Sequence, residues 1–266
     1  MKKDIRVDYH IHSHWSPDSS MEMLTILEEC REKKILNIAL TEHVDLFYPK
    51  PTDLEFDIKS YQKEVGKLKK YYKDLHILTG IEVGVNQNNC DATQKLLEKY
   101  SFDFVIASIH TSESHSFCHR FILNHFSKED VLKLYFNEME YVSENLQDFQ
   151  VLGHMDYIMR YHPYTADEYL AYTPQIKRIF KNLIRTNKGI EINTKGWNKR
   201  IWLHPILDLL EIFKDMGGVY ITIGCDSHAP SQLGDNFANA LELLQKAGFT
   251  DYYLYPEHRW EPVPID

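Results

Sequence analysis

The sequence lacks several features that mark other classes of protein. It has four cysteines in 266 residues and no C-x-x-C pair, so we expect neither a disulfide framework nor a zinc site built on thiolates. No stretch approaches the roughly 18 uninterrupted apolar residues of a membrane-spanning helix, and the N-terminus shows no signal-peptide core. These absences predict a cytoplasmic protein with no membrane partner.

Positive charge is also scarce. The 30 lysines and arginines are outnumbered by 39 aspartates and glutamates, which gives a formal net charge of −9. A protein with this balance does not offer nucleic acid or anionic lipid a broad electrostatic surface. The sequence therefore favours a small-molecule substrate over a nucleic-acid partner, and it leaves the oligomeric state open.

Short apolar runs alternate with helix-length amphipathic segments along the chain. Seven runs rich in β-branched residues predict strands over Ile5–Tyr9, Ile35–Leu40, His76–Ile81, Phe104–Ile109, Gln150–Gly153, Gly189–Ile192 and Val219–Gly224. Apolar residues at three- and four-residue spacing predict helices over Met23–Lys34, Lys59–Lys73, Lys128–Asn145, Thr173–Asn187 and His204–Met216. This alternation is typical of βα units around a parallel sheet.

We therefore expect an α/β fold, a distorted seven-stranded (β/α)7 barrel of the TIM type. No internal repeat, low-complexity tract or Pro/Ser-rich linker interrupts the pattern, which predicts one domain over residues 1–266. The segment after Phe249 contains three prolines, and we expect it to form an irregular strap over the surface.

Histidine is abundant, with 14 residues, and its placement is informative. Six of the seven predicted strands end in residues that can bind a metal ion, namely His10, His12, His43, Glu82, His110, His154, Asp226 and His228. The carboxyl ends of parallel barrel strands form one rim, so these side chains should meet there. A lone histidine at a strand end is usually structural, but six such ends together indicate a metal site. Imidazole and carboxylate ligands without thiolate suit zinc, manganese or iron, and their number implies more than one ion.

Six short segments carry these candidates in a fixed order: Asp8-Tyr9-His10-Ile11-His12, Thr41-Glu42-His43, Gly80-Ile81-Glu82, Ser108-Ile109-His110, Gly153-His154-Met155-Asp156 and Gly224-Cys225-Asp226-Ser227-His228. The series resembles the PHP (polymerase and histidinol phosphatase) superfamily of metal-dependent phosphoesterases, and within it the histidinol-phosphate phosphatase branch. The resemblance runs from Asp8 to His228, which is most of the chain. It implies a distorted seven-stranded barrel with a trinuclear site, in agreement with the strand pattern.

The resemblance also implies three sets of metal ligands: His10, His12, Glu82 and Asp226 for a first ion, Glu82, His110 and His154 for a second, and His43 and His228 for a third. Many family members complete the third site with a histidine, whereas this sequence has Asp18 in a Ser-Pro-Asp turn. Asp18 is either a ligand or a plain turn residue. The expected cofactors are two to three divalent ions, of zinc, manganese or iron.

Such ions suit phosphate-ester chemistry. Phosphate-monoester hydrolysis is among the slowest uncatalysed reactions. Divalent ions lower the pKa of bound water from 15.7 to about 7 and clamp the attacking and leaving oxygens. We expect a metal-bridging hydroxide, oriented by Glu82, to attack phosphorus directly, with Asp226 and His228 as further catalytic residues.

Four other side chains are candidates for substrate binding. Arg160 and Arg200 follow predicted strand ends, and their guanidinium groups match phosphate oxygens, although both are alternatively surface arginines. Glu191 and Asn193 stand on the sixth predicted strand and could meet a substrate amine. Glu191 is alternatively a buried carboxylate with its hydrogen bonds satisfied.

Our leading hypothesis is an enzyme of histidine biosynthesis that hydrolyses L-histidinol phosphate to L-histidinol and phosphate. One alternative is a PHP phosphoesterase that acts on another small phosphate ester or on nucleic-acid ends. Another is a non-catalytic metal-binding PHP module. The net negative charge disfavours the nuclease, and the complete ligand set disfavours the non-catalytic module.

Overall fold

Seven parallel strands form the central sheet of the protein. The computed structural model describes residues 6–47, 56–112, 115–118, 120–162, 164–195, 197 and 203–265. The sheet has the order β1-β2-β3-β4-β7-β8-β9. Its strands are β1 (Arg6–Ile11), β2 (Ile35–Val44), β3 (His76–Gly84), β4 (Phe104–Ser108), β7 (Val151–Leu152), β8 (Gly189–Asn193) and β9 (Ile221–Gly224). All seven predicted strands are confirmed, although Ile5 lies outside the described residues.

The sheet curls into a nearly closed barrel. Ile11 at the end of β1 forms an isolated parallel bridge with Ser227, which follows β9. The amide of His12 donates to the carbonyl of Ser227 at 3.1 Å, and the amide of Ser227 donates to the carbonyl of His10 at 3.3 Å. The first and last strands therefore meet at their carboxyl ends, and the expected distorted (β/α)7 barrel is confirmed.

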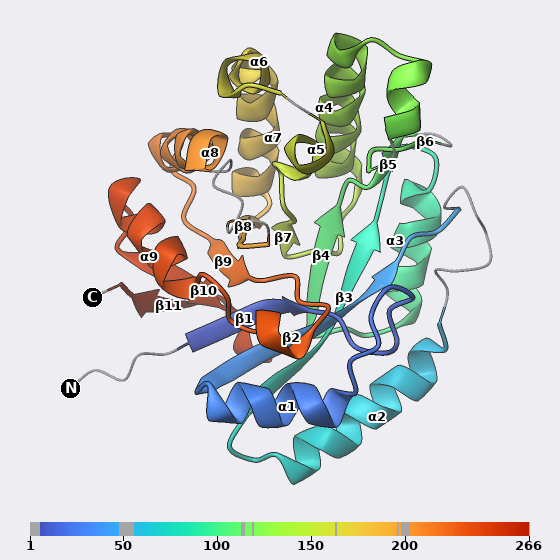
Figure 1. Cartoon of the computed structure of the whole chain (residues 1–266), viewed down its shortest axis with the longest axis vertical. Coiled ribbons are helices and arrows are strands. Elements are labelled where there is room, and N and C mark those ends of the chain that lie inside the picture. Colours follow the sequence, from blue (N-terminus) through green and yellow to red (C-terminus); the bar gives the residue numbers. More distant parts are fainter. Residues whose placement is uncertain are drawn as a thin grey trace.

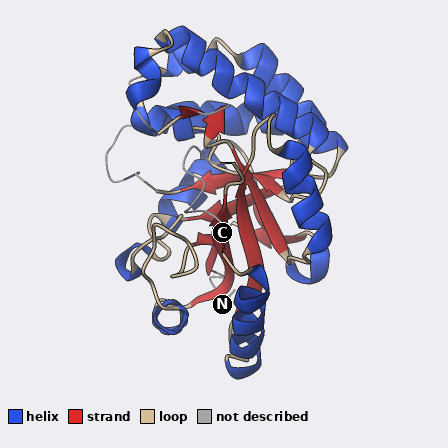
Figure 2. Cartoon of the chain, turned by 90° about the vertical axis from the view of Figure 1, so that its right-hand side faces the viewer, coloured by secondary structure: helices blue, strands red, loops and turns tan. Residues whose placement is uncertain are grey.

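Helices surround the strands, as Figure 2 shows. The longer ones are α1 (Met23–Glu32), α2 (Ile58–Tyr71), α3 (Cys90–Lys99), α4 (Lys128–Asn145), α7 (Thr173–Arg185), α8 (Leu203–Asp215) and α9 (Phe237–Lys246), and α5 (Tyr157–Tyr161) and α6 (Ala166–Leu170) are short (Figure 1). The five predicted helices are confirmed to within three residues at each end. No helix in the part of the chain that is described is long and apolar enough to cross a membrane.

Local side-chain chemistry sets where the helices begin. Asp57 accepts hydrogen bonds from the amides of Lys59 and Ser60 at the start of α2, and Ser127 accepts from the amide of Asp130 at the start of α4. Such caps satisfy amides that have no partner within the helix. The observed bounds of α4, Lys128–Asn145, are those predicted from the sequence.

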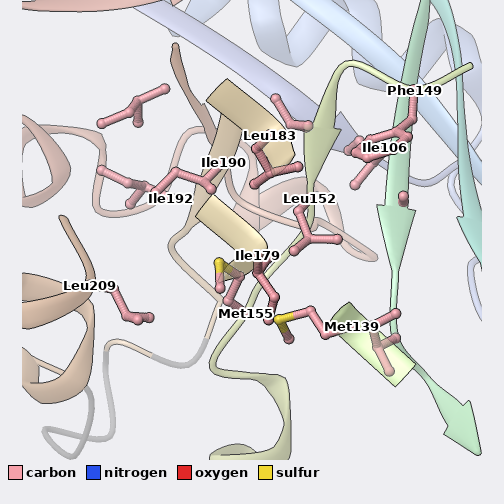
Figure 3. Packing of buried hydrophobic residues seen from close by; sticks show 14 of the residues in the cluster. Ile106, Met139, Phe149, Leu152, Met155, Ile179, Leu183, Ile190, Ile192 and Leu209 are labelled. Atoms are coloured by element: carbon pink, nitrogen blue, oxygen red, sulfur yellow. The ribbon is translucent and has the colours of Figure 1, made fainter. Parts of the chain in front are cut away.

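Buried apolar side chains form two clusters between the strands and the outer helices. Ile179 and Leu183 on α7 are fully buried, and Figure 3 shows them grouped with Leu152 of β7 and Ile190 of β8. The central strands are buried along their whole length, as parallel strands covered by helices usually are. This rigid core positions the carboxyl-end rim on which the functional residues stand.

The segment after Phe249 differs from the prediction. It forms an antiparallel hairpin of β10 (Asp251–Leu254) and β11 (Glu261–Pro264), not an irregular strap. Tyr252 and Val263 face each other across the hairpin and are buried. The prolines are compatible with a two-stranded ribbon because each strand has a free edge that needs no amide donor.

Candidate metal centre

The predicted ligands meet at the carboxyl-end rim of the barrel. His10 lies in β1, His43 in β2 and Glu82 in β3, because these strands continue two to four residues beyond their predicted ends. His43 and Glu82 are paired neighbours in the parallel register of β2 and β3, so their side chains project from the same face. Five further ligand candidates follow the ends of their strands by one to four residues, namely His12, His110, His154, Asp226 and His228.

The carboxylate of Glu82 is the centre of this group. Its Oε2 lies 2.9 Å from Nδ1 of His43, 3.1 Å from Nε2 of His10 and 3.4 Å from Nε2 of His12. Its Oε1 lies 2.9 Å from Nε2 of His154 and 3.4 Å from Nε2 of His110. Five imidazoles therefore face one fully buried carboxylate, and each oxygen points to a different subset.

Asp226 and Asp18 extend the group on the side of His12. Oδ1 of Asp226 lies 3.5 Å from Nε2 of His12. Oδ2 of Asp18 lies 3.0 Å from Nε2 of His228 and 3.6 Å from Nε2 of His43. This position of Asp18, beside the two histidines expected in the third set, favours the ligand interpretation over a plain turn residue.

Three atoms at the centre have no hydrogen-bond partner among the described residues, although they are buried: Nε2 of His10, Nε2 of His12 and Oε2 of Glu82. Buried polar atoms of native proteins are normally satisfied, and imidazole and carboxylate are zinc ligands. The residues present therefore fit divalent metal ions. Ligand atoms lie within 4.8 Å of one another in three groups, His10/His12/Glu82, His12/His43/His228 and His43/Glu82/His110. This grouping places His43 closer to Glu82 and His110 than the resemblance implied.

The electrostatics of the group also favour cations. Burial opposes the charge of the Glu82 carboxylate, but His10, His43 and His110 outweigh burial and hold its pKa well below the usual value. Burial likewise opposes the charge of Asp226, whose pKa is held well below its usual value mainly by Lys195 and His10. Both carboxylates are thus ionised at neutral pH and can accept metal ions.

Carboxylates behind the group fix the direction of two of its imidazoles. Nδ1 of His10 lies 2.6 Å from Oε1 of Glu191, and Nδ1 of His110 lies 2.8 Å from Oδ2 of Asp45. A metal-binding histidine commonly donates its second ring N–H to such a partner, which turns the other nitrogen to the metal. Asp45 was not predicted from the sequence. It comes two residues after His43, and residues i and i+2 of an extended segment point to the same side.

A cleft of about 280 Å³ opens over the group. Arg160 and Lys195 line it together with the aromatic rings of Tyr157 and Tyr161. Nζ of Lys195 lies 2.8 Å from Oδ1 of Asp226. Lys195 was not predicted from the sequence, although it stands two residues after β8, where a barrel rim places functional residues. The cleft therefore has two cations beside the ligand group.

The four predicted substrate residues differ in where the structure places them. Arg160 lines the cleft, whereas Arg200 lies outside the described residues. Glu191 does not line the cleft, because its oxygens accept from Nδ1 of His10 and the amide of His154. Asn193 is also buried, and its Oδ1 accepts from Arg160 at 2.9 Å. This arrangement favours the alternative interpretation of Glu191 as a satisfied buried carboxylate.

Known proteins are similar to this chain in sequence and in fold. The family model of the PHP domain matches residues 8–195. A "probable histidinol-phosphatase" of Clostridium acetobutylicum is 33% identical over 249 residues, which cover 93% of this chain and 96% of the relative. A histidinol-phosphatase of Lactococcus lactis is 31% identical over 250 residues, which cover 92% of both chains.

A solved structure is similar over nearly the whole chain. The crystal structure of histidinol phosphate phosphatase from Lactococcus lactis, complexed with zinc, L-histidinol and phosphate, has a TM-score of 0.87 and 29% sequence identity. The similarity covers 96% of this chain and 98% of that one. Together with the PHP match over residues 8–195, these similarities show that the chain belongs to the PHP domain family, in its histidinol-phosphatase branch.

Proposed function

We propose that the protein is a metal-dependent phosphatase that hydrolyses L-histidinol phosphate to L-histidinol and phosphate. The observation that carries this proposal is the buried Glu82 carboxylate, faced by five imidazoles, beneath a cleft lined by Arg160 and Lys195. Such a site combines metal ligands with fixed positive charge for a phosphate group. The relatives and the zinc-, histidinol- and phosphate-bound neighbour support the choice of substrate.

We assign the metal ligands as His10, His12, Asp18, His43, Glu82, His110, His154, Asp226 and His228. They would hold two to three divalent ions, and zinc is favoured by the zinc-bound neighbour. Divalent ions supply Lewis-acid chemistry, because they lower the pKa of water and neutralise phosphate charge. Glu82 shares its two oxygens between the two sides of the site, which suits a carboxylate that bridges ions.

The residues of the chain itself bind and orient the phosphate ester. Arg160 is nearly buried and lines the cleft, and its Nη1 lies 3.4 Å from Oδ2 of Asp226, which holds it in place. Lys195 approaches the other oxygen of the same carboxylate. The two cations can therefore place phosphate oxygens over the ligand group, while Tyr157 and Tyr161 provide an aromatic wall for the remainder of the substrate.

A substrate comparison with purified, zinc-loaded protein tests the proposal. We expect kcat/KM for L-histidinol phosphate to exceed that for p-nitrophenyl phosphate by about 100-fold or more, because a site that recognises a specific substrate discriminates on this order. Equal turnover of the two esters would remove the substrate assignment. Absence of phosphatase activity in protein shown to contain zinc would remove the enzymatic assignment.

Two further predictions from the sequence accompany this proposal. We propose that residues 1–266 fold as one domain, which predicts a single cooperative unfolding transition. We also propose that the protein acts in the cytoplasm, where its four cysteines stay reduced, and all four are free in the structure.

A further inference from the structure

A chain of buried hydrogen bonds runs from His12 to a carboxylate that does not face the metal centre. Nδ1 of His12 lies 3.0 Å from Oγ of Ser16, and Oγ of Ser16 lies 2.6 Å from Oε2 of Glu42. All three side chains are buried, with at most 1% of each residue exposed. Water therefore does not compete for these bonds. Each contact must have one donor and one acceptor, so the direction of one bond limits the direction of the next.

Glu42 accepts every hydrogen bond that it makes in the described part of the chain. The backbone amide of Ser13 lies 3.0 Å from Oε2 and 3.2 Å from Oε1, and the hydroxyl of Ser13 lies 2.6 Å from Oε1. Converging donors on both oxygens are the environment of an ionised carboxylate, which has no proton to donate.

The single proton of the Ser16 hydroxyl is therefore committed to Glu42. Its lone pairs must accept from the other neighbours, and the amide of His43, which can only donate, lies 3.1 Å from the same oxygen. The remaining contact, with the His12 ring, must then have Nδ1 as the donor. It follows that Nδ1 of His12 carries the proton and Nε2 carries the lone pair.

His12 differs in this respect from His10 and His110. His10 and His110 meet carboxylates directly, and a carboxylate can only accept. The first partner of His12 is a hydroxyl, which by itself can donate or accept. Glu42 removes this ambiguity. Nε2 of His12, which has no hydrogen-bond partner among the described residues, is then free to bind an ion beside Glu82 and Asp226.

We infer that Ser16 and Glu42 are positioning residues that hold His12 in the Nδ1–H tautomer and so prepare its Nε2 for metal. This inference rests on the metal centre of the proposed function. Ser16 also holds the backbone of His43, so the same hydroxyl positions two neighbouring ligands. Neither Ser16 nor Glu42 lines the cleft.

The tautomer can be measured directly in the zinc-free protein. Long-range ¹H–¹⁵N correlation spectra of protein labelled with ¹⁵N-histidine distinguish Nδ1–H from Nε2–H, and the His12 signals are those absent from a His12→Gln variant. We expect wild-type His12 to be protonated at Nδ1. Protonation at Nε2 in the wild type would overturn the inference without any use of a Ser16 or Glu42 variant.

Zinc binding provides the second measurement. Ser16→Ala and Glu42→Gln should lower zinc affinity, measured by competition with a chelator, about 10- to 100-fold, as expected for loss of an outer partner of a metal ligand. Ser19→Ala is the matched control, because the Ser19 hydroxyl donates to the backbone carbonyl of His12 and does not contact its ring. Both Ser16→Ala and Glu42→Gln should also change the His12 tautomer, whereas Ser19→Ala should not.

The outcomes separate this inference from the proposed function. Zinc affinity and His12 tautomer unchanged in folded Ser16→Ala protein would overturn the positioning role while leaving the metal centre intact. If wild-type protein binds no zinc at all, the proposed function fails, and the wild-type tautomer still tests the hydrogen-bond chain. Circular dichroism confirms that each variant is folded.

Discussion

Nζ of Lys195 lies 2.8 Å from Oδ1 of Asp226, in the wall of the cleft above the ligand group. The other oxygen of Asp226 lies 3.4 Å from Nη1 of Arg160. One buried carboxylate is therefore flanked by two cations and by the imidazole of His12 at 3.5 Å. Metal ions that bind Asp226 would share its negative charge. Lys195 and Arg160 could then turn their positive charge toward a phosphate.

Lys195→Met should weaken substrate binding. A hydrogen bond between charged groups contributes about 1.5–3 kcal/mol, which corresponds to roughly 10- to 100-fold in kcat/KM. We expect most of the change in KM and in inhibition by inorganic phosphate, measured by steady-state kinetics on zinc-loaded protein.

Lys195→Arg is the matched control, because it keeps the charge and should recover part of the activity. Zinc content should be the same in both variants. An unchanged KM for Lys195→Met, with full zinc content, would show that Lys195 serves only as a partner of Asp226.

Glu82→Ala should remove metal binding while the barrel stays folded. Glu82 contacts five imidazoles, so its loss takes away a ligand common to both sides of the centre. The apolar core lies elsewhere, between the strands and helices such as α7. We expect zinc stoichiometry to fall and activity to drop by about 100-fold or more. Even the loss of a residue that only hydrogen-bonds to a metal ligand typically lowers metal affinity or activity about 10- to 100-fold. Circular dichroism should be close to that of the wild type, and global unfolding would contradict the separation of core and site.

Zinc affinity should fall as the pH is lowered from 8 to 6. Burial lowers the pKa of His10 and of His110, but nearby carboxylates, Glu191 and Asp45 first among them, outweigh burial and raise both pKa values well above the usual 6.5. These imidazoles hold protons in the metal-free protein above pH 6.5, and a metal ion must displace them. Each displaced proton changes the apparent affinity on the order of tenfold per pH unit.

Competition with a chelator whose own pH dependence is known measures this change. Histidines with ordinary pKa values would give a decline only below about pH 6.5. An affinity independent of pH between 6 and 8 would show that His10 and His110 carry no proton for zinc to displace.

The sequence predicted the strands and the convergence of the candidate ligands because both follow from local rules. Apolar runs have the length of buried strands, and the rim rule says where strand-end residues such as His154 and Asp226 must meet. Neither inference requires knowledge of which side chains touch. The order of motifs then sufficed to identify the family.

Contacts between distant segments could not be predicted in this way. Glu191 stands on β8 in the position of a substrate residue, yet its oxygen binds the ring of His10, 181 positions earlier in the chain. Lys195 follows a strand end but has no pattern of its own, and its partner Asp226 becomes visible only in the folded chain. The hairpin after Phe249 was missed because its prolines favour irregular structure locally, while pairing and burial of Tyr252 and Val263 stabilise strands.

Asp103 provides a test of stability far from the cleft. Its Oδ2 accepts a hydrogen bond from the backbone amide of Thr79 at 2.8 Å and pairs with Nζ of Lys69. Partial burial opposes its charge, but Lys69 and Thr79 outweigh burial and lower the pKa of Asp103 below its usual value. Because the folded pKa is lower than the unfolded one, this carboxylate stabilises the fold above the unfolded pKa of about 3.9. That stabilisation is lost as the pH falls through the folded pKa.

Asp103→Asn should therefore lower the free energy of unfolding at pH 7 by about 1 kcal/mol, from urea titrations followed by circular dichroism on zinc-free protein. The difference from wild type should shrink once the pH is below about 4, where unfolded Asp103 is protonated. Asp74→Asn is the control, because Asp74 pairs with Arg31 at an exposed position, where an ion pair contributes little. A destabilisation by Asp103→Asn that is equally large at pH 3.5 and pH 7 would mean that the side chain acts through its shape and not through its charge.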